Sequence, residues 1–409
     1  MDTLLDRFCR YVRIETTAVE GAGKYPSSPG QLVLGRMLQA ELDALGLDDV
    51  SVDRHGIVMA TVPGNVQAPT IAWVSHMDTS PEASGKNVKP VIHRNYNGKD
   101  IALPGDQSKV ITVADTPELA DLKGQTIITT DGTTLLGADD KAGLATIMTT
   151  AAKLMADKRI KHGPIRIIFT CDEEIGAGTD KFNLKKINAQ VAYTLDGEGA
   201  GSLEHETFSA DLALVTVTGY NIHPGLATHK MINAIRLAAE FISRMPWQRL
   251  APETTSGRDG FLHPYTIEGG VDQVTIRVLL RSFVTGELKE QAKILKTVAA
   301  SVLAEHPKAK IEVKVKKQYR NMAEHLTKEP RAVDLAAKAI RKVGLEPSLQ
   351  SIRGGTDGSH LSEMGLPTPN LSVGMHNFHS PLEFACLEQM ETAVAVLIEL
   401  AKLWGKQKR

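Results

Sequence analysis

The sequence predicts an α/β protein: a sheet with helices on both faces, and a small α+β domain inserted into it. Two observations lead to this prediction. In the first half, short apolar runs typical of buried strands alternate with helical patterns, which is the order found in layered α/β proteins. After about residue 206 the apolar runs become longer and the pattern changes, which indicates a second domain.

The first half contains two predicted helices and four predicted strands. Residues 30–45 and 141–156 carry apolar side chains at helical spacing, and Gly46 follows the first of these helices as a C-cap. The strands are short apolar runs that end in polar or turn-forming residues, at 57–62, 70–75, 165–170 and 191–195.

The second pattern predicts the order β-α-β-α-β. Its segments are the extended runs 211–219, 271–283 and 311–317 and the helices 233–245 and 287–305. From about residue 327 the chain reads as helix, loop and helix, so the two outer parts are expected to close one core. The predicted domains are therefore 1–206 and 327–409 for the larger domain and 207–326 for the inserted one.

Composition excludes several classes of protein. Lys and Arg total 47 against 48 Asp and Glu, a formal net charge of −1, which argues against binding to nucleic acid steered by charge. No apolar stretch is long enough to span a membrane, and the first residues lack the basic and apolar regions of a secretory signal. Three scattered cysteines do not form a disulfide framework. We therefore expect a cytoplasmic globular protein with no nucleic-acid or membrane partner.

Five polar clusters stand out, three of them directly after predicted strands. They contain five side chains that could bind a metal, namely His76, Asp139, Glu174, Asp196 and His379. Ligands bind at the carboxyl ends of strands in an open α/β sheet, and imidazole with carboxylate suits zinc or a similar divalent cation. One cation needs three or four of these ligands, whereas two cations that share a carboxylate are served by all five.

Two further acids have no ligand role in this scheme. Asp78 lies two residues after His76 and could accept a hydrogen bond from its imidazole, which would fix the tautomer. Glu173 precedes Glu174 and points a different way, so it is the candidate general base. Each cluster also has an ordinary structural explanation, such as a helix start or a turn, and only the set of five points to chemistry.

The motifs resemble those of the M20 family of di-zinc metallopeptidases. The similarity extends from Leu4 to the C-terminal helix, and it rests on four segments as well as the ligands: 135–143 (LLGADDKAG), 221–225 (NIHPG), 251–255 (APETT) and 352–358 (IRGGTDG). Cys171, Glu198 and Ser380 depart from the family pattern, which has proline, glycine and glycine there, but none removes an expected ligand.

The resemblance implies a role for each matched residue. His76, Asp139 and Asp196 would bind one zinc ion and Asp139, Glu174 and His379 the other, with cobalt or manganese as alternatives. Asp78 would orient His76, and Glu173 would activate the bridging water. The family also implies a cis peptide bond between Asp139 and Asp140.

The resemblance further implies that the inserted domain is a lid with a surface for homodimerisation. The matched lid residues would contact the peptide substrate: His223 at the transition state, and Arg281, Asn321 and Arg353 at the peptide backbone and carboxylate.

The expected activity is metal-dependent removal of the N-terminal residue from short peptides, with tripeptides preferred by resemblance. A related amidohydrolase or carboxypeptidase acting on N-acyl amino acids or dipeptides is the alternative, because it uses the same metal chemistry. A metal-free peptide-binding homologue is a third reading, but it predicts the loss of a ligand or of Glu173, and none is missing.

Overall fold

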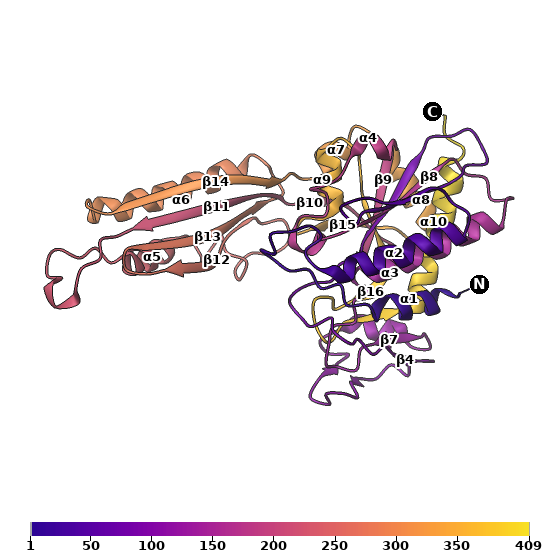
Figure 1. Cartoon of the computed structure of the whole chain (residues 1–409), viewed down its shortest axis with the longest axis horizontal. Helices are drawn as coiled ribbons and strands as arrows, with labels where there is room; N and C mark the ends of the chain where they lie inside the picture. Colours follow the sequence, from indigo (N-terminus) through magenta and orange to yellow (C-terminus); the bar gives the residue numbers. More distant parts are fainter. Residues whose placement is uncertain (1, 409) are drawn as a thin grey trace. The chain divides into compact units, whose positions relative to one another are not determined.

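The computed structural model describes residues 2–408, which form two compact units (Figure 1). The first unit runs to His205 and resumes over Met322–Ser351 and from Thr356 onward. The second comprises Glu206–Asn321 and Ile352–Gly355. The sequence predicted that the larger domain is interrupted after residue 206 and resumes after residue 326. These domain boundaries stay a prediction.

A mixed sheet of eleven strands lies at the centre of the first unit, in the order β1-β2-β8-β3-β9-β16-β17-β7-β4, with β10 joining β15 to β16. Its strands are β1 (Asp48–Val52), β2 (Val58–Val62), β3 (Ile71–His76), β4 (Val91–His93), β7 (Ile127–Thr129), β8 (Ile165–Thr170), β9 (Val191–Glu198), β10 (Ser202–Thr207), β15 (Ser348–Ile352), β16 (Asn370–His376) and β17 (Phe384–Cys386). A separate hairpin joins β5 (Ile101–Ala102) to β6 (Val110–Ile111).

The four central strands, β8, β3, β9 and β16, are parallel to one another. The strands outside them pair antiparallel. Because parallel strands end at the same edge, the residues that follow β3, β8, β9 and β16 meet there.

Helices cover both faces of this sheet, so the predicted α/β layer architecture is confirmed. The helices α3 and α10 pack on one face, whereas Ile187 of α4 and Leu361 of α9 join strand residues in a hydrophobic cluster on the other. The helices of this unit are α1 (Leu4–Val12), α2 (Pro29–Ala44), α3 (Ala138–Ala156), α4 (Leu184–Ile187), α7 (Ala323–Leu326), α8 (Arg331–Lys342), α9 (Asp357–Glu363) and α10 (Leu387–Trp404), with 3-10 turns η1 (Pro117–Leu122) and η2 (Glu173–Ile175).

The expectation of only helix, loop and helix after residue 327 is wrong. Three strands lie there, and β16 belongs to the parallel centre of the sheet. All seven residues of β16 are buried, although Asn370, Ser372 and Gly374 alternate with Leu371, Val373 and Met375. Asn370, Ser372 and Gly374 interrupt the apolar run that would otherwise indicate a buried strand.

The second unit has an antiparallel sheet in the order β12-β13-β11-β14. Its elements are β11 (Ser209–Thr218), η3 (Pro224–Leu226), α5 (Ala234–Ser243), β12 (Phe261–Gly269), β13 (Gln273–Ser282), α6 (Glu287–Glu305) and β14 (Lys310–Tyr319). Helices α5 and α6 bury apolar side chains such as Phe241 and Leu295 against the sheet. The predicted order β-α-β-α-β did not include β12. Pro264 and an irregularity in pairing between Pro264 and Thr266 interrupt the alternation of this strand.

No helix within residues 2–408 has the length and apolarity needed to cross a membrane. The expected cytoplasmic location stays a prediction.

Candidate metal centre

The five predicted ligands converge at the carboxyl edge of the parallel strands. His76 is the last residue of β3, Asp196 lies near the end of β9, and Glu174 belongs to the turn η2 that follows β8. His379 lies in the loop after β16, and Asp139 lies at the start of α3. Residues spread along most of the chain are thereby brought to one place.

Asp139 lies between the two imidazoles. Its Oδ1 is 2.9 Å from Nε2 of His76, and its Oδ2 is 3.3 Å from Nε2 of His379. The same His379 nitrogen is 2.9 Å from Oε2 of Glu174, and the same His76 nitrogen is 3.6 Å from Oδ1 of Asp196. The Asp139 carboxylate therefore has one oxygen on each side of the cluster, as a bridging ligand requires.

The donor set fits a pair of divalent cations. Ligand atoms of His76, Asp139 and Glu174 lie within 4.8 Å of one another. Oε1 of Glu174 and Oδ1 of Asp196 are buried and have no hydrogen-bond partner among the described residues, which is costly unless a cation binds them. Burial, and next the nearby Asp139, raise the pKa of Glu174 to about 7. Crowded carboxylates with two imidazoles, which bind a cation in their neutral form, are a suitable environment for zinc or a similar ion.

The loop that carries Asp139 is held by a buried carboxylate. Oε2 of Glu383 accepts hydrogen bonds from the backbone N–H groups of Leu136 and Gly137, at 2.8 and 2.7 Å, and its Oε1 accepts one from Asp139 at 3.0 Å. Gly137 has φ +80°, a conformation that favours glycine. The predicted cis peptide bond between Asp139 and Asp140 is present.

Asp140 fastens the start of α3 to the sheet. Its carboxylate accepts hydrogen bonds from the Ser75 hydroxyl and from the backbone N–H groups of His76 and Gly143. A Cβ atom at Gly143 would lie 2.2 Å from the carbonyl oxygen of Leu195, so only glycine permits this approach of α3 to β9. Although ligand atoms of Asp140, His76 and Asp196 also lie within 4.8 Å of one another, the contacts of Asp140 give it a structural role.

Asp78 contacts His76 differently from the expectation. The Nδ1–H of His76 points to the backbone carbonyl of Asp78 at 3.1 Å, whereas the Asp78 carboxylate is 3.6 Å away. That carboxylate accepts hydrogen bonds from the backbone N–H groups of Glu173 and Glu174, at 3.1 and 3.0 Å. Asp78 thus fixes His76 through its main chain and the η2 turn through its side chain.

Glu173 lies next to the predicted metal ligands, but it is not expected to bind a metal itself. Burial raises its pKa well above the ordinary range, and the negative charges of Asp357, Asp196 and Glu174 add to this, against the opposing effect of His76. Bound cations would oppose the increase. A carboxylate whose proton affinity is raised beside a metal centre can accept a proton from water near neutral pH.

The four predicted substrate contacts belong to the second unit. His223 is exposed and accepts a hydrogen bond from the backbone of Gly225. Arg281 donates to the backbone of Asp211 and Leu280 and to Gln318, and Asn321 is 3% exposed. Within the second unit, Arg281, Asn321 and Arg353 therefore make structural contacts that the sequence did not predict.

Arg353 is the third of these. Its guanidinium donates to the carbonyl oxygens of Gly257 and Asp259, at 2.8 and 2.9 Å, and lies over the rings of Phe208 and Phe261. Its substrate role, like that of the other three, stays a prediction.

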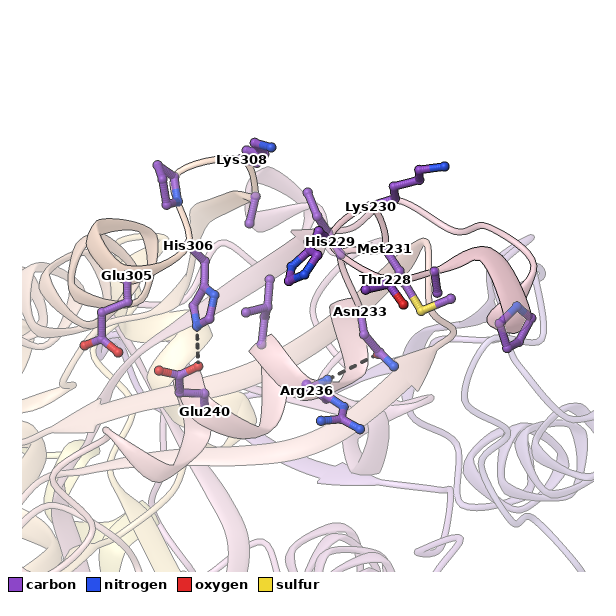
Figure 2. Close-up of a pocket in the computed structure, with 16 residues that line it drawn as sticks. Thr228, His229, Lys230, Met231, Asn233, Arg236, Glu240, Glu305, His306 and Lys308 are labelled. Carbon is purple, nitrogen blue, oxygen red and sulfur yellow. Dashed lines mark hydrogen bonds and ion pairs between the residues drawn. The ribbon is translucent and has the colours of Figure 1, made fainter.

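A second group of potential ligands lies in the second unit, beside a cavity of about 960 Å³ (Figure 2). Glu240, Glu305 and His306 form it, and Nε2 of His306 is 3.0 Å from Oε2 of Glu240. Arg244 pairs with both glutamates, at 2.8 Å from Glu305. Because Arg244 pairs with both glutamates and His306 contacts Glu240, we interpret this group as an ion-pair cluster rather than a metal centre.

Sequence reasoning missed three buried polar residues around the centre. Glu383 is described above, Asp357 accepts a hydrogen bond from the Thr170 hydroxyl at 2.8 Å, and Asn370 accepts one from the backbone of Asp196 at 3.0 Å. Asp357 lies inside one of the matched motifs, and Glu383 lies four residues after His379. The sequence positions of both residues could therefore have indicated that they lie near the centre. Asn370 had none.

The family model for peptidase family M20/M25/M40 matches residues 130–403. A peptidase T from a Geobacillus strain is 44% identical over 406 residues, which is 99% of each chain. Among solved structures, a tripeptidase from Staphylococcus aureus is 25% identical with a TM-score of 0.78, over 99% of this chain and 98% of that one. The aminopeptidase PepT of Bacillus cereus is 26% identical with a TM-score of 0.74, over 98% of each chain.

Proposed function

This chain belongs to peptidase family M20/M25/M40, and from that premise we propose how it works as a metal-dependent aminopeptidase. The enzyme releases the N-terminal residue from short peptides, and the relatives named for peptidase T and tripeptidase activity favour tripeptides as substrates. The observation that carries the metal assignment is the position of Asp139, with one carboxylate oxygen toward each imidazole.

We propose two cations in each subunit, with zinc as the metal and cobalt or manganese as alternatives. His76, Asp139 and Asp196 would hold one, and Asp139, Glu174 and His379 would hold the other. When bound, such ions supply Lewis acidity, which lowers the pKa of water and polarises a carbonyl group.

The chain's own residues then move the proton. Glu173 accepts a proton from the attacking water and returns it to the leaving amine, which is the ordinary cycle of a general base. The backbone carbonyl of Asp78 keeps the Nδ1–H tautomer of His76, so that Nε2 faces the centre. The side chain of Asp78 holds the turn that carries Glu173 and Glu174.

The second unit is proposed to act as a lid and as a surface for homodimerisation. His223 would contact the substrate at the transition state, with Arg281, Asn321 and Arg353 at its backbone and carboxylate. These assignments rest on the motifs shared with the family. Because Arg281, Asn321 and Arg353 make contacts within the second unit, substrate binding would have to compete with these contacts.

The direct test incubates the metal-loaded enzyme with Ala-Ala, Ala-Ala-Ala and Ala-Ala-Ala-Ala and identifies the released residue with isotopically labelled N-terminal alanine. Labelled alanine released fastest from the tripeptide, and none after removal of metal by a chelator, is the expected result. Release of the C-terminal residue, or turnover of N-acetylated alanine in place of the free peptides, would instead support the related amidohydrolase or carboxypeptidase.

A further inference from the structure

We propose that Glu82 binds the free amino group of the substrate, and that the cavity beside it takes the N-terminal side chain. This inference rests on the proposed aminopeptidase function and adds to it the residue that selects an unblocked N-terminus. All residues involved belong to the first unit.

Glu82 lies at the edge of the metal centre. Its Oε2 is 3.4 Å from Nδ1 of His379, the nitrogen on the opposite side of the ring from Nε2. The side chain of Glu82 is 67% exposed, so its carboxylate remains accessible to a ligand. No hydrogen bond from the described residues reaches that carboxylate.

The backbone around Glu82 is fixed, although the side chain is not. The N–H of Glu82 donates to the Ser80 hydroxyl, and the preceding Pro81 restricts its own φ angle. Thr79 pairs with Thr17 in a parallel bridge, and its carbonyl accepts the N–H of Ala18. The carboxylate is therefore carried on a defined loop that continues from β3.

Glu82 is one of the residues that line a cavity of about 710 Å³. This cavity is lined by residues from three segments: Glu15, Thr17 and Val19; Ser28, Pro29, Gly30 and Val33; and Pro81, Glu82, Ala83, Ser84 and Gly85. Its surface is mainly small and apolar, with two acidic residues and no Lys, Arg or His among the lining residues. Such a lining suits an apolar or small side chain and attracts a neighbouring cation.

The geometry of a peptide connects these two features. The amino nitrogen of the N-terminal residue lies only about 2.5 Å from the carbonyl carbon that is attacked, because a single Cα separates them. A carboxylate that binds the ammonium group must therefore lie within a few ångströms of the metal ligands. Glu82 satisfies this condition through its position beside His379.

The other carboxylates near the centre have tasks of their own. Asp139, Glu174 and Asp196 face the cations, and Glu173 is the general base. Asp78 and Glu383 accept hydrogen bonds from the backbone. Glu198 resembles Glu82: its side chain is 53% exposed, and its Oε1 is 3.5 Å from Nδ1 of His376, which is not a predicted ligand.

This similarity makes Glu198→Gln the matched control for Glu82→Gln, since both remove one charge from an exposed glutamate near the centre. The metal-loaded proteins are assayed with Ala-Ala-Ala and with lactyl-Ala-Ala, which has a hydroxyl in place of the ammonium group. Hydrolysis of the analogue is measured, or its Ki as a competitor where turnover is too slow. Metal content is measured for every protein.

We expect Glu82→Gln to lower kcat/KM for Ala-Ala-Ala by about 10- to 100-fold, the loss typical of one hydrogen bond to a charged group. The analogue should be almost unaffected, metal content unchanged, and Glu198→Gln should keep the wild-type preference. Equal losses for both substrates, or loss of metal, would overturn the proposal and make Glu82 an orienting partner of His379. If the wild type cleaves no peptide, the proposed function itself fails, which is a different result.

Discussion

The carboxylate of Asp78 accepts the backbone N–H of Glu173 at 3.1 Å, and so connects the loop after β3 to the turn after β8. A second hydrogen bond, to the N–H of Glu174, makes this contact bidentate. The loop that follows His76 therefore also fixes the proposed general base and one proposed metal ligand. His76 itself is oriented by the main chain of Asp78, which a change of side chain leaves in place.

Asp78→Asn separates these two roles. The asparagine keeps the backbone carbonyl that faces His76, but its side-chain NH₂ opposes one of the two N–H groups of η2. We expect kcat to fall by about 10- to 100-fold, with two metal ions still bound at saturating metal. Metal titration with kinetics measures both quantities. Wild-type kcat in Asp78→Asn would mean that the carboxylate is dispensable for holding Glu173.

Glu173→Gln removes the proposed base while preserving the size of the side chain. Because glutamine cannot accept the proton from water, we expect kcat to fall by about 10²- to 10⁴-fold, whereas metal content and substrate KM change little. Steady-state kinetics on Ala-Ala-Ala, with metal analysis of the same samples, provides the measurement. If the variant binds its metal fully and still turns over at a near-normal rate, another group takes the proton.

Glu383→Gln loosens the loop that carries Asp139. Glutamine has one acceptor oxygen where glutamate offers two, so at least one of the three backbone N–H groups loses its partner in a buried place. We expect metal affinity to fall by about 10- to 100-fold and the free energy of unfolding by about 1–3 kcal/mol.

The matched control is Glu388→Gln, because Glu388 also accepts a backbone N–H, that of Thr126, at 2.8 Å. Competition with a metal-binding dye and thermal unfolding are measured for both variants. Equal loss of metal affinity in the two would show a general effect of destabilisation, and the loop-holding role of Glu383 would be abandoned.

The sequence predicted which side chains cluster better than it predicted the contacts that support them; their role as metal ligands stays a prediction. His76 ends one strand and Glu174 lies in the turn after another, and the rule that parallel strands end at one edge brings them together without knowledge of the whole fold. Glu383 contacts Leu136, Gly137 and Asp139 from a distant part of the chain, and no local pattern marks such a contact.

The missed strands have a similar cause. A strand buried on both faces is usually recognised by a continuous apolar run, and in β16 that run is interrupted by Asn370 and Ser372. Asn370 is polar because its side chain accepts the N–H of Asp196 and donates to Glu204. Asn370, which interrupts the apolar run of the strand, thus supports Asp196, a proposed metal ligand.

Glu204 leads to a prediction about pH. The pKa of Glu204 is raised to about 7, and burial is the largest cause of this rise. The hydrogen bond from Asn370 opposes it. Because the folded-state pKa exceeds the ordinary value of 4.5, the unfolded chain loses this proton first, and stability falls as pH rises from about 4.5 to 7. At about 1.4 kcal/mol per pKa unit, the loss is on the order of 3 kcal/mol. Glu204→Gln lacks this titration and keeps an oxygen for Asn370. Urea unfolding at pH 5 and pH 8 should therefore show the wild type losing stability relative to the variant, whereas a constant difference between the two proteins would mean that Glu204 is ionised in the folded state at both pH values.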